Sequence, residues 1–223
     1  MYYLHLLPKI FFNIEPMTDY PKVSKVFYQN RNVVEVARNL IGKYLFTRLD
    51  GLVTGGYIVE TEAYNGPIDR ASHAYGNKRT PRTETIFMAG GVAYIYLCYG
   101  IHEMLNIVTS VEDEPLAVLI RAINPTVGLD IMQSRRNMAV IKPNITMGPG
   151  SVAKALGISR KINSISLQSD TLWLEDRGLT FADDQVAVVP RIGVDYAKED
   201  ALLPYRFYVK GNPYVSRPVK GGL

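Results

Sequence analysis

The segment from Tyr44 to Tyr64, YLFTRLDGLVTGGYIVETEAY, constrains the fold of this chain most strongly. It consists of two largely apolar runs separated by Asp50-Gly51, and an Asp-Gly pair in that setting is a strong signal of a β-hairpin. The segment therefore predicts two antiparallel strands that turn at Asp50 and Gly51.

Further strands are predicted where β-branched, aromatic and other apolar residues dominate short runs. They cover residues 92–100, 104–110, 115–123, 170–176 and 185–194. The strands do not alternate regularly with helices and no repeat is visible, so the sequence favours an α+β fold. We expect a single domain, residues 27–223, built around a mostly antiparallel, curved β-sheet with short helices around it.

The helices are predicted from their end signals. Asn32 can cap a helix with Glu35 three residues later, as in a capping box, and Gly42 suits its C-terminal end. A short helix is predicted from Pro125 to Met138. Another, capped by Ser151, follows the glycine turn of MGPGSVAKALGI.

Residues 1–26 form a predicted N-terminal extension that lies on the body of the protein. The segment is apolar at first, but Pro8 interrupts it, and it has neither a basic leader nor a small-residue cleavage site. No apolar run is long enough to cross a bilayer. We therefore expect neither a signal peptide nor a membrane partner.

The single cysteine, Cys98, and the three widely spaced histidines limit the possible chemistry. They exclude an internal disulfide and a cysteine-rich zinc site, so we expect no metal. An intracellular setting is expected, the cytoplasm or nucleoid of a prokaryote or the nucleus of a eukaryote. The formal charge of +4 permits a nucleic-acid partner without requiring one.

Two glutamates stand two residues apart in YIVETEAY, which reads as a strand. Since side chains alternate along a strand, Glu60, Glu62 and Tyr64 share one face, and the alternate residues from Tyr57 to Ala63 form the core side. The carboxylates are therefore expected to point together, away from the packed face. A solvated strand face with cross-strand salt bridges would show the same pattern.

An arginine lies near the end of the continuous apolar run PLAVLIRAINP. A buried guanidinium needs a carboxylate or several carbonyl acceptors, and Glu60 and Glu62 are the obvious partners of Arg121. A glutamate held ionised in this way is suited to activating water. A purely structural ion pair is the alternative.

Aromatic side chains are dense in AYIYLCYG. Tyr94 and Tyr96 share a strand face, whereas Tyr99 is out of phase and precedes Gly100, so we expect Tyr99 at the tip of a turn. Tyrosines at this spacing usually pack the sheet, but a projecting one can also act as a wedge between stacked bases. Asn106, an amide in an apolar strand, either bonds nearby backbone or lines a pocket.

The loop DRASHAYGNKRTPR is rich in basic residues, and beside a cleft it would contact phosphates. An ordinary solvated loop has the same composition. The turn before Ser151 offers free N–H groups at a helix N-terminus, which also suits a phosphate. The candidate DNA-backbone contacts are Arg70, Lys78, Arg79, Arg82 and Ser151.

Together these motifs resemble the alkyladenine (3-methyladenine) DNA glycosylase family, the monofunctional alkylpurine DNA glycosylases. The resemblance runs from about Phe27 to Ser216. It rests on several long motifs in the same order, namely VARNLIGKYL, VETEAYNGPIDRASHA, TPRTETIFMAGGVAYIYLCYGIHEMLNIV, VLIRAINP, MGPGSVAKALGI, RIGV and YRFYVKGNPYVS.

The resemblance implies a role for each matching residue. Glu62 corresponds to the family's water-activating base, and Arg121 and the backbone of Ile192 to the groups that help place the water. Three further residues match those that sandwich the flipped base, namely Tyr64, His73 and Tyr96. Tyr99 matches the tyrosine that fills the gap left in the duplex, and Asn106 the asparagine that screens the purine edge.

The implied activity is repair of double-stranded DNA that contains damaged purines. A monomer without cofactor would flip an alkylated or deaminated purine and hydrolyse its N-glycosidic bond, leaving an abasic site without a strand-nicking lyase step. Two alternatives remain open from the residues themselves. One is a carbohydrate glycosidase that uses Glu60 and Glu62 as its carboxylate pair. The other is a non-catalytic nucleic-acid-binding module with tyrosine stacking platforms.

Overall fold

The computed structural model describes residues 20–219, so most of the predicted N-terminal extension lies outside the described residues. One antiparallel sheet runs through the molecule in the order β3-β4-β5-β2-β1-β6, with β8 beside β2 and β7 beside β8. The strands are β1 (Tyr44–Leu49), β2 (Leu52–Tyr64), β3 (Ala93–Cys98), β4 (His102–Thr109), β5 (Leu116–Val127), β6 (Leu172–Glu175), β7 (Val186–Val189) and β8 (Arg206–Val209).

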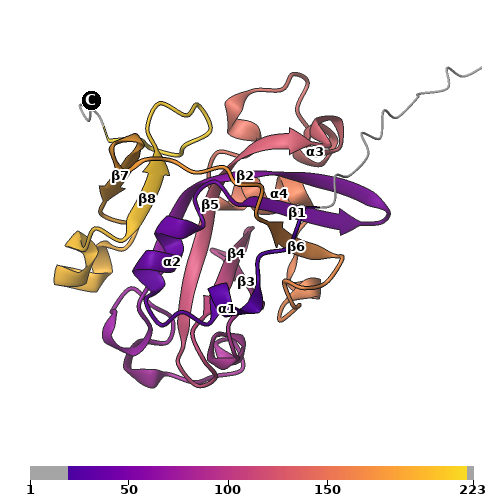
Figure 1. Cartoon of the computed structure of the whole chain (residues 1–223). Helices are drawn as coiled ribbons and strands as arrows, with labels where there is room; N and C mark the ends of the chain where they lie inside the picture. Colours follow the sequence, from indigo (N-terminus) through magenta and orange to yellow (C-terminus); the bar gives the residue numbers. More distant parts are fainter. Residues whose placement is uncertain (1–19, 220–223) are drawn as a thin grey trace, which may run out of the picture.

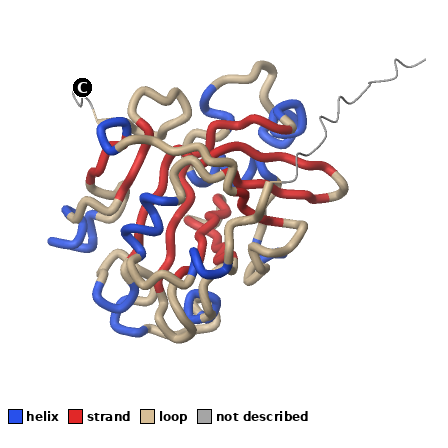
Figure 2. The backbone as a smooth tube through the Cα atoms, in the orientation of Figure 1, coloured by secondary structure: helices blue, strands red, loops and turns tan. Residues whose placement is uncertain are grey.

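Short helices surround this curved sheet (Figures 1 and 2). They are α1 (Lys25–Tyr28), α2 (Val33–Asn39), α3 (Leu129–Arg136) and α4 (Pro149–Leu156), with short 3-10 helices in the loops. The predicted α+β fold around a curved antiparallel sheet is confirmed.

The predicted hairpin forms between β1 and β2. Asp50 has a φ of 53° and Gly51 a φ of 75°, and Leu49 pairs with Leu52 across the two-residue turn. Asp and Gly adopt these positive φ angles more readily than other residues, and the resulting twist matches that of the flanking strands.

Strand β2 organises the sheet because its two halves have different neighbours. Its first half pairs with β1, and its second half, from Glu60 to Glu62, pairs with β8, while β5 runs along its other edge. The pairing with β5 shifts register on both sides of Glu60, which leaves Val59 and Arg121 without a direct partner. Such bulges bend strands and redirect side chains, and they are frequent beside functional sites.

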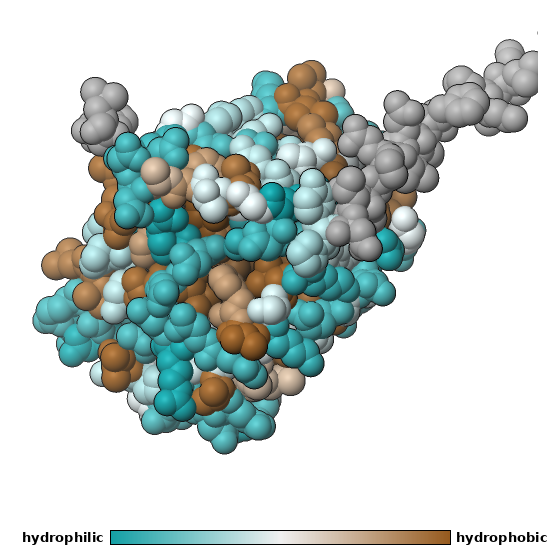
Figure 3. Space-filling view, viewed as in Figure 1, coloured by the Kyte–Doolittle hydropathy of each residue, from teal (hydrophilic) through white to brown (hydrophobic). Residues whose placement is uncertain are grey.

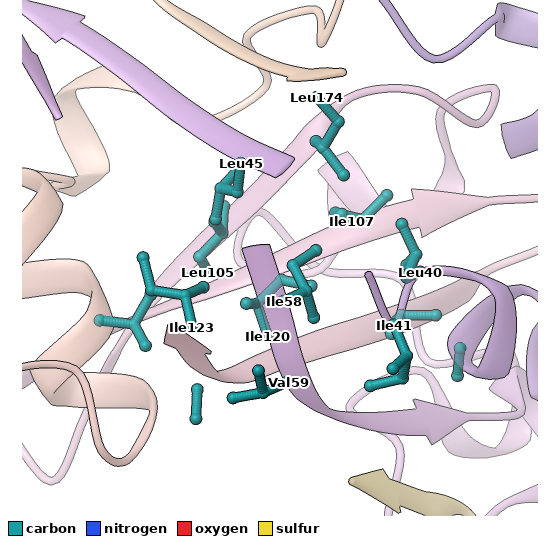
Figure 4. Close-up of a cluster of buried hydrophobic side chains, with 14 of the residues drawn as sticks. Leu40, Ile41, Leu45, Ile58, Val59, Leu105, Ile107, Ile120, Ile123 and Leu174 are labelled. Atoms are coloured by element: carbon teal, nitrogen blue, oxygen red, sulfur yellow. The ribbon is translucent and has the colours of Figure 1, made fainter. Parts of the chain in front are cut away.

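One hydrophobic core joins the strands to helices α2 and α4. Figure 4 shows Leu40 and Ile41, just beyond α2, on one side of Ile58 and Ile120, and Ile123 on the other side. Valine, isoleucine and leucine make up most of the core, and burial of each such side chain contributes about 1.5–3 kcal/mol. The surface in Figure 3 is mostly hydrophilic, with separate apolar patches.

The start of α2 follows its predicted signals. The Asn32 side chain accepts a hydrogen bond from the Glu35 N–H at 3.1 Å. The reverse half of the capping box does not form, because the Glu35 carboxylate instead accepts from the side chain of Asn30. Gly42, at a φ of 89°, follows the helix end.

Two helix predictions need correction. The segment from Pro125 to Val127 continues β5, because Pro125 and Val127 pair with Gly56 and Gly55 of β2, and α3 begins only at Leu129. Ser151 does not cap α4. The cap position is Gly148, and Pro149, with its fixed φ, occupies the first helical position.

Strand β8 is absent from the predictions, and β7 ends before Pro190 rather than running to Val194. Four-residue strands carry too few positions for a period-two pattern to stand out. Both strands form because β8 pairs with β2 and β7 pairs with β8.

The described end of the N-terminal extension packs against β6. The Val23 N–H donates to the Leu174 carbonyl at 2.9 Å, and the Lys22 ammonium pairs with Asp170 at 2.8 Å. Within residues 20–219, no helix is both long enough and apolar enough to span a membrane.

We predict that Leu105→Ala lowers the free energy of unfolding by about 2–5 kcal/mol, because it leaves a cavity in the core. Leu105 lies in β4 with 0% exposure. Ile101→Ala, at a side chain that is 72% exposed, is the matched control and should change that energy by no more than about 0.5 kcal/mol. Urea titration measures both, and similar losses would contradict this assignment of the core.

Candidate active site

A cavity of about 1030 Å³ opens between the end of β2, the β3–β4 hairpin and the loops around residues 72, 148 and 193. It gathers residues that are far apart in the sequence. Among its walls are most of the residues predicted to act on a substrate, namely Tyr64, His73, Arg82, Tyr96, Tyr99, Asn106, Arg121 and Ile192.

Glu62 lies directly behind this wall. Its Oε1 accepts a hydrogen bond from the Ile192 N–H at 2.8 Å. Its Oε2 accepts from the Tyr64 hydroxyl at 2.9 Å and from the Arg121 guanidinium at 3.2 Å. All three donors line the cavity, whereas Glu62 itself is 0% exposed. The carboxylate is therefore held in one orientation. The groups that bond it lie between the carboxylate and the cavity.

Glu60 is bound more completely and by different groups. Its carboxylate accepts four hydrogen bonds, from the guanidiniums of Arg121 and Arg206 and from both the N–H and the hydroxyl of Ser216, all at 2.7–2.9 Å. Glu60 therefore ties β2 to β5, β8 and the C-terminal segment, and it is fully buried and does not line the cavity.

The prediction that both carboxylates point away from the packed face is wrong in one respect. They do point together and share Arg121, but both are fully buried. Strand β8 pairs with the edge of β2 and brings the Arg206 side chain to Glu60, and Ser216 of the C-terminal segment also bonds Glu60. The alternation of residues along β2 predicts neither contact.

An aromatic group forms the opposite wall. The His73 Nδ1 lies 3.0 Å from the Tyr94 hydroxyl, and the His73 ring meets the Tyr96 ring edge to face with centroids 4.6 Å apart. Burial, assisted by the charge of Arg82, lowers the pKa of His73 to about 4. The imidazole is therefore neutral at pH 7 and can pack against a base without adding charge.

Tyr64 is fixed from two sides. Its hydroxyl donates to Glu62, and the Arg191 guanidinium lies 4.9 Å from its ring centroid. Arg191 in turn bonds both oxygens of Asp69 and the Ala63 carbonyl. Burial and the charge of Glu62 raise the pKa of Tyr64 well above its usual value, so the phenol remains a hydrogen-bond donor.

Asn106 is held by the backbone of the neighbouring strand. Its side-chain amide donates to the Tyr94 carbonyl at 3.2 Å, and the residue is 5% exposed while lining the cavity. Both readings of this residue, as a backbone partner and as a pocket residue, therefore apply.

Tyr99 stands at the tip of the β3–β4 hairpin, as predicted. It has a φ of 49° and is 90% exposed, and Ile101 beside it is 72% exposed. A large apolar side chain so exposed on a tight turn next to a cavity has little packing role in the free protein.

The candidate DNA-backbone residues divide into arginines that pair with a carboxylate and residues that have no carboxylate partner within residues 20–219. Arg79 bonds Glu84 and Asp113, and Arg70 bonds Glu199. Arg82 reaches the cavity wall and lies over the Tyr96 ring, 5.2 Å from its centroid. Lys78 is exposed, and Ser151 lies half-buried in the first turn of α4.

Four residues of this site were not singled out as site residues, namely Asp69, Arg191, Arg206 and Ser216. Arg206 could have been found by the reasoning that found Arg121, because it is an arginine within the apolar run YRFYV. Asp69 and Arg191 lie in loops, where charged residues carry no such signal. Within residues 20–219, no three His, Cys, Asp or Glu side chains gather as a metal site.

Similarity to known proteins extends over most of the chain. Residues 26–213 match the family described as methylpurine-DNA glycosylase (MPG). The chain belongs to the methylpurine-DNA glycosylase family. Every cavity residue discussed above lies within the matched segment, and Ser216 lies just beyond it.

Two relatives show the extent of the similarity within the methylpurine-DNA glycosylase family. A protein of Bacillus cereus (strain G9842) named "Putative 3-methyladenine DNA glycosylase" is 44% identical over 200 residues, which cover 86% of this chain and 97% of the relative. A protein of the same name from Chlamydia pneumoniae is 44% identical over 182 residues, which cover 81% and 91%. The predicted family membership is confirmed.

We predict that the His73 imidazole gains its proton only near pH 4. Because the unfolded chain binds this proton near pH 6.5, the stability contributed by neutral His73 is fully present above pH 6.5 and is lost as the pH falls towards 4. An NMR titration, with the His73 signal assigned by its absence in His73→Gln, measures the midpoint. A midpoint near 6.5 would contradict the buried, neutral role.

Proposed function

We propose that this protein is a DNA glycosylase that removes alkylated or deaminated purines from duplex DNA. It flips the damaged nucleotide into the cavity and hydrolyses the N-glycosidic bond with a water activated by Glu62. The observation that carries the proposal is the Glu62 carboxylate, oriented by Arg121 and Ile192 immediately behind an aromatic cavity. The family and the names of its relatives support the substrate class.

Base flipping is required because the reacting atoms are inaccessible inside a duplex. Extrusion costs a few kcal/mol and is easiest at damaged or mispaired sites. In the proposal Tyr99, exposed at the hairpin tip, fills the gap left in the stack. The extruded purine then packs between Tyr64, His73 and Tyr96, with Asn106 at its edge.

The reaction needs one base and one water. As the bond between C1′ and the purine nitrogen breaks, the bonding electrons leave with the purine and positive charge develops on the sugar. The water oxygen bonds to C1′ while Glu62 accepts its proton, and the product is an abasic site. N3- or N7-alkylated purines are cationic, so they leave as neutral bases and are good leaving groups. A neutral purine such as hypoxanthine leaves as an anion and takes up one proton from solvent. Neither route calls for a metal or organic cofactor.

The Tyr64 hydroxyl occupies one position on the Glu62 carboxylate in the free protein. We propose that stacking of a base on Tyr64 moves this hydroxyl enough for a water to take its place on Oε2. The cavity wall offers no lysine among the described residues, which agrees with hydrolysis rather than a Schiff-base lyase step.

Contacts to the DNA backbone are proposed for the basic loop residues Arg70, Lys78, Arg79 and Arg82 and for the first turn of α4 at Ser151. Since Arg70 and Arg79 already bond carboxylates, each must exchange a carboxylate for a phosphate. Such an exchange keeps each guanidinium in a charge-assisted hydrogen bond.

The two alternative functions fit the geometry poorly. A carbohydrate glycosidase needs two carboxylates flanking one sugar bond, but Glu60 and Glu62 both lie fully buried behind the same wall, where they share Arg121. A non-catalytic module leaves no role for the buried, precisely bonded Glu62, since a carboxylate repels phosphate.

We predict that the protein releases free methylpurine from methylated duplex DNA and leaves abasic sites that break only after alkali treatment. Chromatography of the released base, with unmethylated duplex as control and a chelator present throughout, measures this. Duplex binding without release would favour the non-catalytic module. Release of reducing sugar from a glycan, without base release, would favour the carbohydrate enzyme.

A further inference from the structure

The charges around the cavity are unevenly compensated. Three arginines line it, Arg82, Arg121 and Arg217, and among the described residues no carboxylate does so. Arg121 is neutralised from behind by Glu60 and Glu62, and Arg206, which shares Glu60, completes a group of two cations and two anions. The wall formed by β2 and β5 is therefore close to neutral.

Arg82 is different because it has no carboxylate partner in residues 20–219. Its guanidinium carbon lies 5.2 Å from the Tyr96 ring centroid, over one of the rings proposed to hold the base. The same charge lowers the pKa values of His73 and Tyr94, so it acts across this wall. Since His73 is neutral at pH 7, Arg82 is the cation that a base on Tyr96 meets.

Tyr64, on the other side of the proposed base position, provides a comparison. It also carries a guanidinium, that of Arg191 at 4.9 Å. That guanidinium is paired with Asp69 and fully buried, so the pair adds little net charge to the cavity. Arg217 also lines the cavity without a described carboxylate partner, but no aromatic contact links it to either tyrosine.

A positive charge near the stacking ring affects substrates according to their own charge. A ring binds a cation through its negative face, and a guanidinium already over that ring competes for the same attraction and repels a second cation. A purine alkylated at N3 or N7 carries a positive charge, whereas a deaminated purine such as hypoxanthine is neutral.

We propose that Arg82 is a specificity-determining residue that favours neutral damaged purines over cationic alkylated ones. The inference rests on the proposed function, because it concerns the same cavity and reaction. It assigns Arg82 a role beyond phosphate binding, since a phosphate contact would serve every lesion in the same duplex equally.

The test compares single-turnover release of 7-methylguanine, which is cationic, and hypoxanthine, which is neutral, from duplexes of one sequence. Arg82→Met removes the charge and keeps much of the shape, and Arg82→Lys keeps the charge. Arg79→Gln is the matched control, because Arg79 lies in the same loop but does not line the cavity. The rate of each variant is divided by the wild-type rate on the same base, so the difference in shape between the two purines cancels.

Arg82→Met should raise the ratio of 7-methylguanine to hypoxanthine release about tenfold, equivalent to about 1.4 kcal/mol, while Arg82→Lys and Arg79→Gln leave it unchanged. An unchanged ratio with Arg82→Met would overturn the inference and leave the proposed function intact. If both rates also fell equally, Arg82 would be a phosphate contact only. If the wild-type protein releases neither base, the proposed function fails and the inference fails with it.

Discussion

The Glu60 carboxylate, buried between the guanidiniums of Arg121 and Arg206, is the interaction on which the rest of the site depends. It joins β2, β5, β8 and the segment around Ser216 at one point. Removing one partner of such a buried pair leaves an uncompensated charge, which typically costs about 3–5 kcal/mol. The register shifts on both sides of Glu60 place Arg121 where it also reaches Glu62.

This arrangement separates two tasks between neighbouring carboxylates. Glu60 accepts four hydrogen bonds from Arg121, Arg206 and Ser216, of which Arg206 does not line the cavity, whereas all three donors to Glu62 line it. Arg121 and Arg206 pair with the two glutamates behind the wall. Arg82 and Arg217 line the cavity without a carboxylate partner among the described residues, and Arg82 is the one that lies over an aromatic ring, that of Tyr96.

The sequence was informative where local chemistry decides structure. The pair Asp50-Gly51 predicted the hairpin, and Gly100 predicted the exposed position of Tyr99. The single charge in an apolar run predicted that Arg121 pairs with the two glutamates. Burial of those glutamates is not predictable from alternation, because Arg206 and Ser216, which bond Glu60, come 146 and 156 residues later in the chain. The cap of α4 was misassigned because Pro149, with its fixed φ, competes with Ser151 for the helix start.

The division of tasks between Glu60 and Glu62 is tested most directly by single-turnover base release per folded molecule in Glu60→Gln and Glu62→Gln. Both changes keep the side-chain shape and remove a charge. The account predicts that Glu62→Gln lowers release by about 10²–10⁴-fold, the contribution expected of a general base, while Glu60→Gln, corrected for its folded fraction, stays within about tenfold of wild type. Equal losses at the two positions, or release that survives Glu62→Gln, would contradict it.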